Sequence, residues 1–162
     1  MKNWQPIYVG DGSALVSLTL GMHAIVDADD VRLLLGTSWQ ARWRHDGKTA
    51  YASSNRGVRM HRLILGAQPD QLVDHRDHDG LNNRRKNLRL ATHTQNSVNR
   101  RTQPGRNLKG AFPHRQKWCA RIKIAGRSVH IGSFDTEAAA HEAYLVRVAA
   151  EHGEFAPSGG ML

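Results

Sequence analysis

The side chains best suited to chemistry lie between residues 73 and 96, in the stretch VDHRDHDGLNNRRKNLRLATHTQN. It gathers histidine, aspartate and asparagine among arginine and lysine. Histidine, with an ordinary pKa near ~6.5, can take a proton at neutral pH. Aspartate and asparagine oxygens suit a hard cation such as Mg²⁺. The stretch therefore has two interpretations, a metal-assisted catalytic site or a basic loop rich in turn-forming residues.

Short elements on either side of this polar segment could position its side chains. QLVDH and KNLRL are long enough to pair as two strands, with the residues between them supplying the turn. Thr92, followed three residues later by Gln95, matches a capping box and predicts a helix that carries Asn96. This order can bring Asp74 and His75 beside Asn96, with Asn87 across from His75.

The positive charge of the chain is concentrated in its middle. The net charge is +9, and the 55 residues from 80 to 134 contain thirteen lysines and arginines and no carboxylate. Such a stretch favours a polyanion, and nucleic acid is the leading candidate because phosphate contacts release counterions. A merely solvated basic face is the alternative. An anionic membrane fits less well, because no basic helix with a broad apolar face is present.

The remaining composition limits the class of protein. Cys119 is the single cysteine, so packing rather than disulfides or a cysteine-rich zinc site must hold the fold. No apolar run approaches the ~20 residues that span a bilayer, and the N-terminus lacks the apolar core of a secretory signal. We expect a soluble, intracellular protein.

The flanking regions show strand and helix patterns. Alternation around Asp46-Gly47 predicts a hairpin with a two-residue type I′ turn and buried tryptophans. Residues 100–110 read as a linker. KWCARIKI and RSVHIGSF predict two strands, one face apolar and the other basic. A helix is expected from Asp135 or Thr136 to about His152. Small residues, namely Ala139, Ala143, Val146 and Ala150, are spaced to lie on one side of this helix.

Together, MHRLIL and VDHRDHDGLNNRRKNLRLATHTQN resemble the ββα-metal core of HNH endonucleases, in the version common in bacteriophages. The segment from residue 110 is similar to the AP2 DNA-binding domain, a three-stranded sheet backed by one helix. Residues 1–55 look like the region that precedes the core in these phage proteins. The resemblance implies an α+β fold with a β-rich N-terminal region (1–55), an HNH nuclease core (56–103) and an AP2-like domain (104–157) with an antiparallel sheet and one packed helix.

The resemblance also assigns roles at the matching positions. His75 would be the general base, and Asn87 the amide that orients its imidazole. Asp74 and Asn96 would hold a divalent metal, most simply Mg²⁺, with Mn²⁺ as another choice. His93, one helical turn before Asn96, is a possible additional site residue, although a solvent-facing role is equally consistent. Asp74 could instead pair with Arg76 or Arg89.

Basic residues are expected to bind double-stranded DNA. The residues expected to contact it are Arg84, Arg85 and Lys86 in the core, and His114, Arg115, Arg121, Lys123, Arg127 and His130 in the AP2-like module. His61 and Arg62 are assigned to packing or phosphate contacts rather than chemistry, and Asn82 and Asn83 to the turn. His78 stands where these nucleases commonly have glycine, which leaves the conformation of that turn open.

The resulting expectation is a metal-dependent DNA endonuclease of the homing type, acting in the cytoplasm of a phage-infected bacterium. No membrane and no obligate protein partner are expected. The main alternative is a sequence-specific DNA-binding regulator with an inactive nuclease core. An RNA-directed or structural basic protein fits less well with an AP2-like module.

Overall fold

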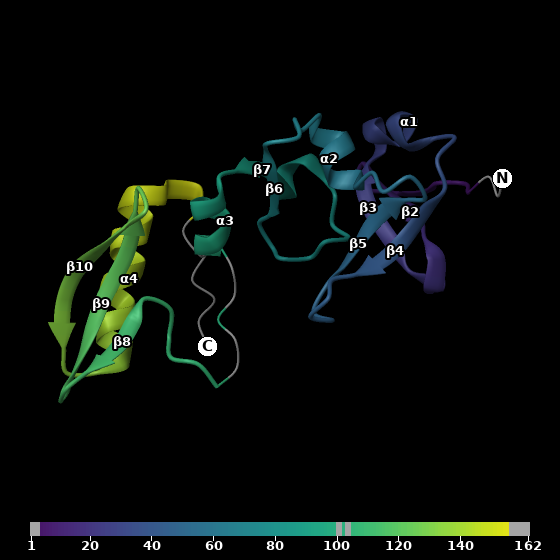
Figure 1. The fold of residues 1–162 in the computed structure, drawn as a ribbon. Helices are drawn as coiled ribbons and strands as arrows, with labels where there is room; N and C mark the ends of the chain where they lie inside the picture. Colours follow the sequence, from purple (N-terminus) through teal and green to yellow (C-terminus); the bar gives the residue numbers. More distant parts are fainter. Residues whose placement is uncertain (1–3, 100–101, 103–104, 156–162) are drawn as a thin grey trace. The chain divides into compact units, whose positions relative to one another are not determined.

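The computed structural model describes residues 4–99, 102 and 105–155. The chain divides into two compact units, residues 1–92 and residues 93–162 (Figure 1). Both contain short antiparallel strands and helices. The α+β class expected from the sequence is confirmed.

The first unit opens with a three-stranded antiparallel sheet in the order β1-β2-β3. Its strands are β1 (Ile7–Val9), β2 (Ser13–Ser17) and β3 (His23–Asp27). Alternate residues of β2 and β3 are fully buried, because a strand points successive side chains to opposite faces. A 3-10 turn at Ala28–Asp30 leads into the single-turn helix α1 (Val31–Leu34). Val31 and Leu34 pack into the same core.

Strands β4 (Trp39–Trp43) and β5 (Ala50–Ser54) form the expected hairpin. The predicted two-residue turn is wrong. The backbone N–H of Arg44 donates to the Thr49 carbonyl, so four residues lie between this closing pair. Only Gly47 has a positive φ, of 67°, whereas a type I′ turn requires positive φ at both central residues. Trp39 is buried as predicted, but Trp43, next to the turn, is 55% exposed.

The rest of the first unit follows the expected strand-turn-strand order. Helix α2 (Met60–Leu65) ends at Gly66, which adopts the left-handed conformation with φ of 62°. Strands β6 (Leu72–His75) and β7 (Leu88–Ala91) pair antiparallel, with a 3-10 turn at Arg85–Asn87 between them. The connecting segment is bonded to β3, since Ile25 donates to the Leu81 carbonyl (2.9 Å) and Asn83 donates to the Ile25 carbonyl (2.7 Å). The N-terminal sheet thus supports the polar loop.

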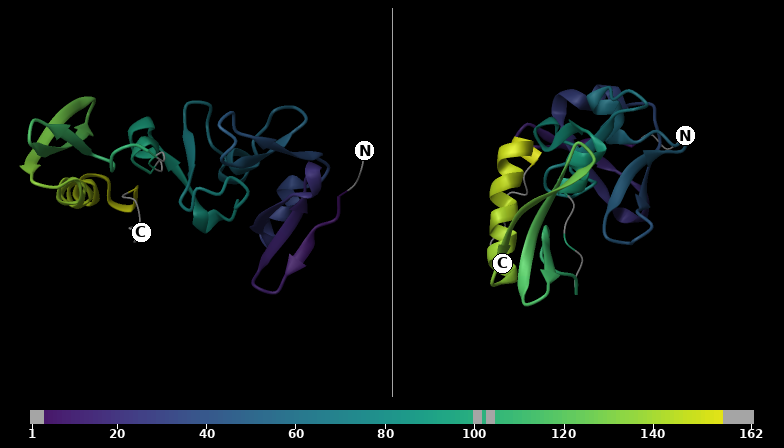
Figure 2. Two further views of the ribbon diagram at one scale, coloured as in Figure 1. Left: turned by 90° about the horizontal axis from the view of Figure 1, so that it is seen from below. Right: turned by 60° about the vertical axis from the view of Figure 1, so that its left-hand side comes forward.

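The second unit contains a three-stranded antiparallel sheet, order β10-β9-β8, with a helix along one face (Figures 1 and 2). The elements in chain order are α3 (His93–Asn99), β8 (Ala111–His114), β9 (Lys117–Ile124), β10 (Arg127–Phe134), α4 (Glu137–His152) and a 3-10 turn at Gly153–Phe155. Thr136 caps α4 by accepting from the Ala139 N–H at 3.1 Å, as predicted. Apolar residues of β9 face α4, and Ile122 is 3% exposed.

The buried side of α4 is not the side of the small residues. The helix buries Ala140, Tyr144 and Val148, which recur every four residues, whereas Val146 is 68% exposed. Tyr144 and Val148 remove more apolar surface from water than the alanines of the other side, so the hydrophobic gain selects their side.

The division between units falls earlier than the expected boundary near residue 104. Helix α3 belongs to the second unit because Val98 packs among Ile122, Tyr144 and Val148. The Nζ of Lys109 also donates to the carbonyls at the end of α3, including Ser97 at 2.8 Å. The functional boundaries at 55/56 and 103/104 stay predictions.

Candidate active site

The paired strands β6 and β7 present His75 at the start of the polar loop. His75 is the last residue of β6 and lies opposite Leu88. Asn87 precedes β7 by one residue, and its carbonyl accepts a hydrogen bond from the Arg76 N–H at 3.0 Å. The structure therefore brings His75 and the backbone of Asn87 to the same end of the hairpin.

His75 is buried, with 6% of its surface exposed. Burial is the main cause that lowers the pKa of its imidazole, and it outweighs the hydrogen bond with Asn83 and the charge of Asp77, which act in the opposite direction. His75 is therefore neutral at neutral pH. A neutral imidazole is the form that can accept a proton.

Two further rings enclose His75. The centroid of the His61 ring lies 5.0 Å from that of the His75 ring, at an interplanar angle of 83°. The centroid of the Tyr51 ring lies 5.7 Å from that of His75. Burial, and then the charge of His75, lower the pKa of His61 to about 3. Arg62 donates to the carbonyls of Gln71 and Gln68, each at 2.6 Å. Of the two roles considered for His61 and Arg62, these contacts favour packing.

A network of side-chain hydrogen bonds fixes the loop between the strands. The amide of Asn87 donates to Asp77 Oδ1 (2.9 Å) and to the Asn82 carbonyl (2.8 Å), and its oxygen accepts from the Asp77 N–H. Asn82 donates to Asp77 Oδ2 at 2.6 Å. Burial raises the pKa of the Asp77 carboxyl, but hydrogen bonds from Asp79, Asn82 and Asn87 give a net lowering. Asn87 thus holds the loop, while its direct action on the imidazole stays a prediction.

Asn83 contacts the imidazole through its side chain. Its Oδ1 lies 3.4 Å from His75 Nε2, and the residue is fully buried. The sequence assigned Asn83 only to the turn. No signal in the sequence separates Asn83 from its neighbours, because its burial comes from tertiary contacts with β3.

Asp74 is buried against Arg89, its partner across the β6–β7 ladder. The Nε and Nη2 of Arg89 donate to Asp74 Oδ2 at 2.9 and 2.7 Å. Both side chains are at most 7% exposed. The structure therefore shows the ion pair considered as the alternative for Asp74, and metal binding by its carboxylate stays a prediction.

The other predicted metal-site residues lie on α3, in the second unit. Asn96 is half-buried and His93 is exposed. No cluster of three or more His, Cys, Asp or Glu is placed to hold a metal among the residues that the structure describes. The side-chain oxygens of Asp74 and Asn96 are of the type that Mg²⁺ prefers, because this ion retains several waters and uses one or two protein oxygens together with substrate phosphate.

The basic residues of the loop are engaged with acidic residues of the N-terminal region. Arg85 donates to both carboxylate oxygens of Asp30 (2.7–3.1 Å), and its backbone N–H donates to Asp27 (2.7 Å). The Nη1 of Arg84 lies 3.9 Å from Asp11 Oδ2. Lys86 is exposed. Phosphate contacts by Arg84, Arg85 and Lys86 stay predictions. A phosphate would have to compete with Asp30 for the guanidinium of Arg85.

The second unit has a basic sheet face. Arg121 lies opposite His130, and Lys123 opposite Ser128, so these four side chains share one face, and all are exposed. His114 and Lys117 pair on the same face at the other end of β9. Phe112 also lies there and is 48% exposed, a feature that the sequence analysis missed. The remaining predicted DNA contacts, Arg115 and Arg127, are exposed at the hairpin ends.

His78 adopts the conformation that glycine would favour. Its φ is +66°, and its N–H donates to the His75 carbonyl at 3.1 Å. Left-handed backbone costs an L-residue about 1–2 kcal/mol. The turn is therefore retained without the glycine common in these nucleases.

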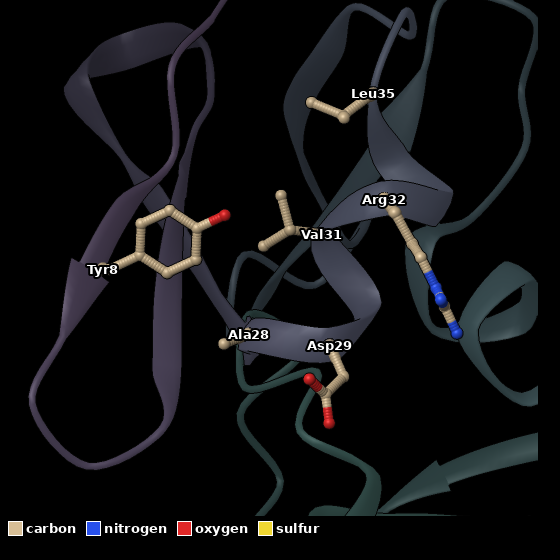
Figure 3. Close-up of a pocket in the computed structure, with 6 residues that line it drawn as sticks. All are labelled: Tyr8, Ala28, Asp29, Val31, Arg32 and Leu35. Atoms are coloured by element: carbon tan, nitrogen blue, oxygen red, sulfur yellow. The ribbon is translucent and has the colours of Figure 1, made fainter.

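A shallow pocket of about 370 Å³ lies elsewhere in the first unit, where α1 and the adjoining 3-10 turn meet the edge strand β1 (Figure 3). Its lining residues are Tyr8, Ala28, Asp29, Val31, Arg32 and Leu35. It contains none of the predicted site residues. No helix in the described part of the chain is long and apolar enough to cross a membrane.

Comparisons with known proteins identify the family of the chain. A family model described as HNH endonuclease matches residues 59–98, which contain α2, the β6–β7 hairpin and most of α3. An uncharacterized HNH endonuclease of Acanthamoeba polyphaga mimivirus is 33% identical over 145 residues, covering 84% of this chain and 74% of the viral protein. No solved structure matches the chain. The chain belongs to the HNH endonuclease family.

Proposed function

We propose that this protein is a metal-dependent DNA endonuclease of the homing type, in which His75 is the general base and the second unit binds the substrate as an AP2-like module. The site would act on double-stranded DNA in a phage-infected bacterial cell. The observation that carries the proposal is the buried His75 next to Asp74 at the end of β6.

His75 supports hydrolysis because its imidazole is kept neutral and held in place. A water molecule that loses a proton to the imidazole forms a new oxygen–phosphorus bond, and the bond from phosphorus to the leaving 3′ oxygen breaks. The rings of His61 and Tyr51 limit the imidazole's rotation. Its position at the rigid end of a strand lets one orientation be maintained through the reaction.

Asp74 and Asn96 would hold the cation, with Mg²⁺ as the first choice and Mn²⁺ as the second. When bound, the cation would supply charge stabilisation for the phosphorane and the leaving oxygen. Arg89 holds the Asp74 carboxylate through Oδ2, so a cation would have to share this carboxylate with the guanidinium.

The basic face of the second unit supports DNA binding. Arg121, Lys123 and His130 project from adjacent positions on two strands. On the same face, Lys117 Nζ lies 3.1 Å from Asp135 Oδ1, an exposed carboxylate. Phosphate contacts from such a face would give affinity without sequence preference. Helix α4 carries most of the acidic residues of this unit and packs behind the sheet.

The test of the nuclease is the nicking of supercoiled DNA with Mg²⁺ or with EDTA. His75→Ala should lose at least ~10²-fold in rate, the lower range for a general base, while its affinity for DNA stays near that of the wild type. His23→Ala, which removes an exposed histidine at the end of β3, is the matched control and should cut normally. Cutting by His75→Ala at the wild-type rate would refute the assignment of the base.

The test of the binding face is the salt dependence of DNA affinity. Arg121→Ala should weaken binding and reduce the slope of log K against log salt by about 1, the effect of one lost phosphate contact. Arg147→Ala removes the same charge from α4, where Arg147 pairs with Glu151, and should leave the slope unchanged. Equal slopes for all three proteins would place the DNA on another surface.

The alternative function is a DNA-binding regulator with an inert nuclease core. The ion pair between Asp74 and Arg89 is the observation in its favour, since a carboxylate committed to arginine is less available to a metal. A regulator would bind DNA with the same salt dependence but would show no nicking in Mg²⁺ or Mn²⁺.

A further inference from the structure

The side-chain amide of Asn83 has a fixed orientation. Its Nδ2 donates to the Leu81 carbonyl at 3.1 Å, and its backbone N–H donates to the Ile25 carbonyl at 2.7 Å. The residue is fully buried, so it is held by protein contacts on all sides. Because the nitrogen faces Leu81, the oxygen is the atom directed at His75, 3.4 Å from Nε2.

An amide oxygen can accept a hydrogen bond but cannot donate one. The nitrogen of a neutral imidazole that faces this oxygen must therefore carry the hydrogen. The second nitrogen of the same ring then holds the lone pair. In His75, this assigns the hydrogen to Nε2 and the basic lone pair to Nδ1.

We propose that Asn83 is a positioning residue that selects the Nε2–H tautomer of His75, so that Nδ1 is the atom that takes the proton from water. The rings of His61 and Tyr51 fix the plane of the imidazole, and Asn83 determines which nitrogen is basic. The catalytic part of this inference rests on the proposed function, whereas the tautomer does not.

The inference gives the N-terminal sheet a role at the site. Ile25 of β3 accepts from Asn83 and donates to Leu81, the residue whose carbonyl orients the Asn83 amide. A single residue of β3 therefore binds both Leu81 and Asn83, the two ends of the short segment that presents the Asn83 amide to His75. The hydrogen bonds between β3 and the loop therefore help to determine which nitrogen of His75 is basic.

The first test reads the tautomer directly and needs no cleavage. The protein is labelled with ¹⁵N-histidine, and long-range ¹H–¹⁵N spectra are recorded at pH 8, with the His75 signals assigned from a His75→Gln variant. The wild type should show the hydrogen on Nε2. Asn83→Leu, which keeps the size of the side chain but removes the acceptor, should show a mixture of tautomers or the Nδ1–H form.

Two variants serve as controls for this test. Asn82→Ala changes the neighbouring amide, whose contacts are with Asp77 and Arg84, and should leave the tautomer unchanged. Asn83→Asp keeps an acceptor oxygen and should retain the Nε2–H form. A wild-type spectrum with the hydrogen on Nδ1 overturns the proposal even if Asn83→Leu does not fold, as does a folded Asn83→Leu that keeps the wild-type tautomer.

The second test measures single-site cleavage. Asn83→Leu should lower kcat about 10- to 100-fold with little change in KM, part of the ~10²–10⁴ that a general base contributes, and Asn83→Asp should recover part of the loss. In a His75→Ala background, Asn83→Leu should have no further effect. Absence of cleavage by the wild type would refute the proposed function while leaving the tautomer result intact. Full activity of a folded Asn83→Leu would refute the positioning role alone.

Discussion

Replacement of Arg89 by methionine should destabilise the first unit by about 3–5 kcal/mol, the usual cost of breaking a buried ion pair from one side. Two hydrogen bonds to Asp74 Oδ2, at 2.9 and 2.7 Å, would be lost where both side chains are at most 7% exposed. Methionine keeps an apolar stem that reaches as far as the Nε of arginine and removes the rest of the guanidinium. The loss would therefore report mainly on the broken ion pair, with a smaller part from the space that the guanidinium filled.

Differential scanning calorimetry of the whole chain can measure this loss. For a unit of this size, 1 kcal/mol corresponds to a Tm change of about 4–8 °C, so the transition of the first unit should fall by at least about 12 °C. Combining Arg89→Met with Asp74→Asn should recover most of the loss, because the buried carboxylate is then also removed. Arg147→Met, which breaks an exposed pair on α4, should cost no more than about 0.5 kcal/mol.

The same variant tests whether Asp74 can bind a metal. Removing the guanidinium takes away a cation that competes for the carboxylate, so Mg²⁺ should stabilise Arg89→Met more than the wild type. Equal stabilisation would argue that Asp74 is a structural residue. A loss below 1 kcal/mol for Arg89→Met would refute the reasoning that this ion pair supports the hairpin.

Three further predictions concern the loop and its neighbours. His78→Gly should raise the stability by about 1 kcal/mol in thermal unfolding, because its φ of +66° disfavours an L-residue. Gly80→Ala would place a Cβ 2.3 Å from the Ala50 carbonyl oxygen. It should cost about 1–3 kcal/mol in urea unfolding, whereas Gly10→Ala, with open space around it, should stay within about 0.5 kcal/mol of the wild type. His61 has a pKa of about 3 in the fold and 6.5 when unperturbed. Only the unfolded chain binds its proton between these values, so stability should fall as the pH drops from 6.5 toward 3, by up to ~1.4 kcal/mol per pH unit. His61→Gln should flatten that slope in acid unfolding, and an unchanged slope would contradict a buried neutral His61.

The sequence predicted the elements whose signals are local. The paired strands around the polar loop and the start of α4 at Thr136 depend on short-range periodicity and capping, and both are confirmed. The turn at Gly47 is longer than the predicted two residues, because its length depends on where β4 and β5 stop pairing. The buried side of α4, where Tyr144 packs with Ile122, was not predicted from the sequence because it depends on the sheet that the helix meets.

Contacts at the candidate site were harder to predict because they join distant parts of the chain. Asn83 and Asn87 have the same chemistry and lie four residues apart, so the sequence could not tell which one touches His75. Their environments in the fold separate them, since Asn83 is bonded to β3 and Asn87 to Asp77. The strand pattern of QLVDH placed His75 correctly on a strand, but the position of its supporting amides depends on tertiary contacts.

Charge shows the same dependence on tertiary structure. The first 55 residues carry as many acidic as basic groups, and no DNA contact was predicted there. In the fold, Asp27 and Asp30 bind Arg85 across 55 or more residues of sequence, so part of the basic run holds the loop to the N-terminal sheet. The charge left for phosphates in the loop is therefore smaller than the sequence suggests, and Lys86 and the sheet face around Arg121 become the stronger candidates. An Asp30→Asn variant, which weakens this competition, should consequently bind DNA with a steeper salt dependence than the wild type, and an unchanged slope would mean that Arg85 does not reach the DNA even when released.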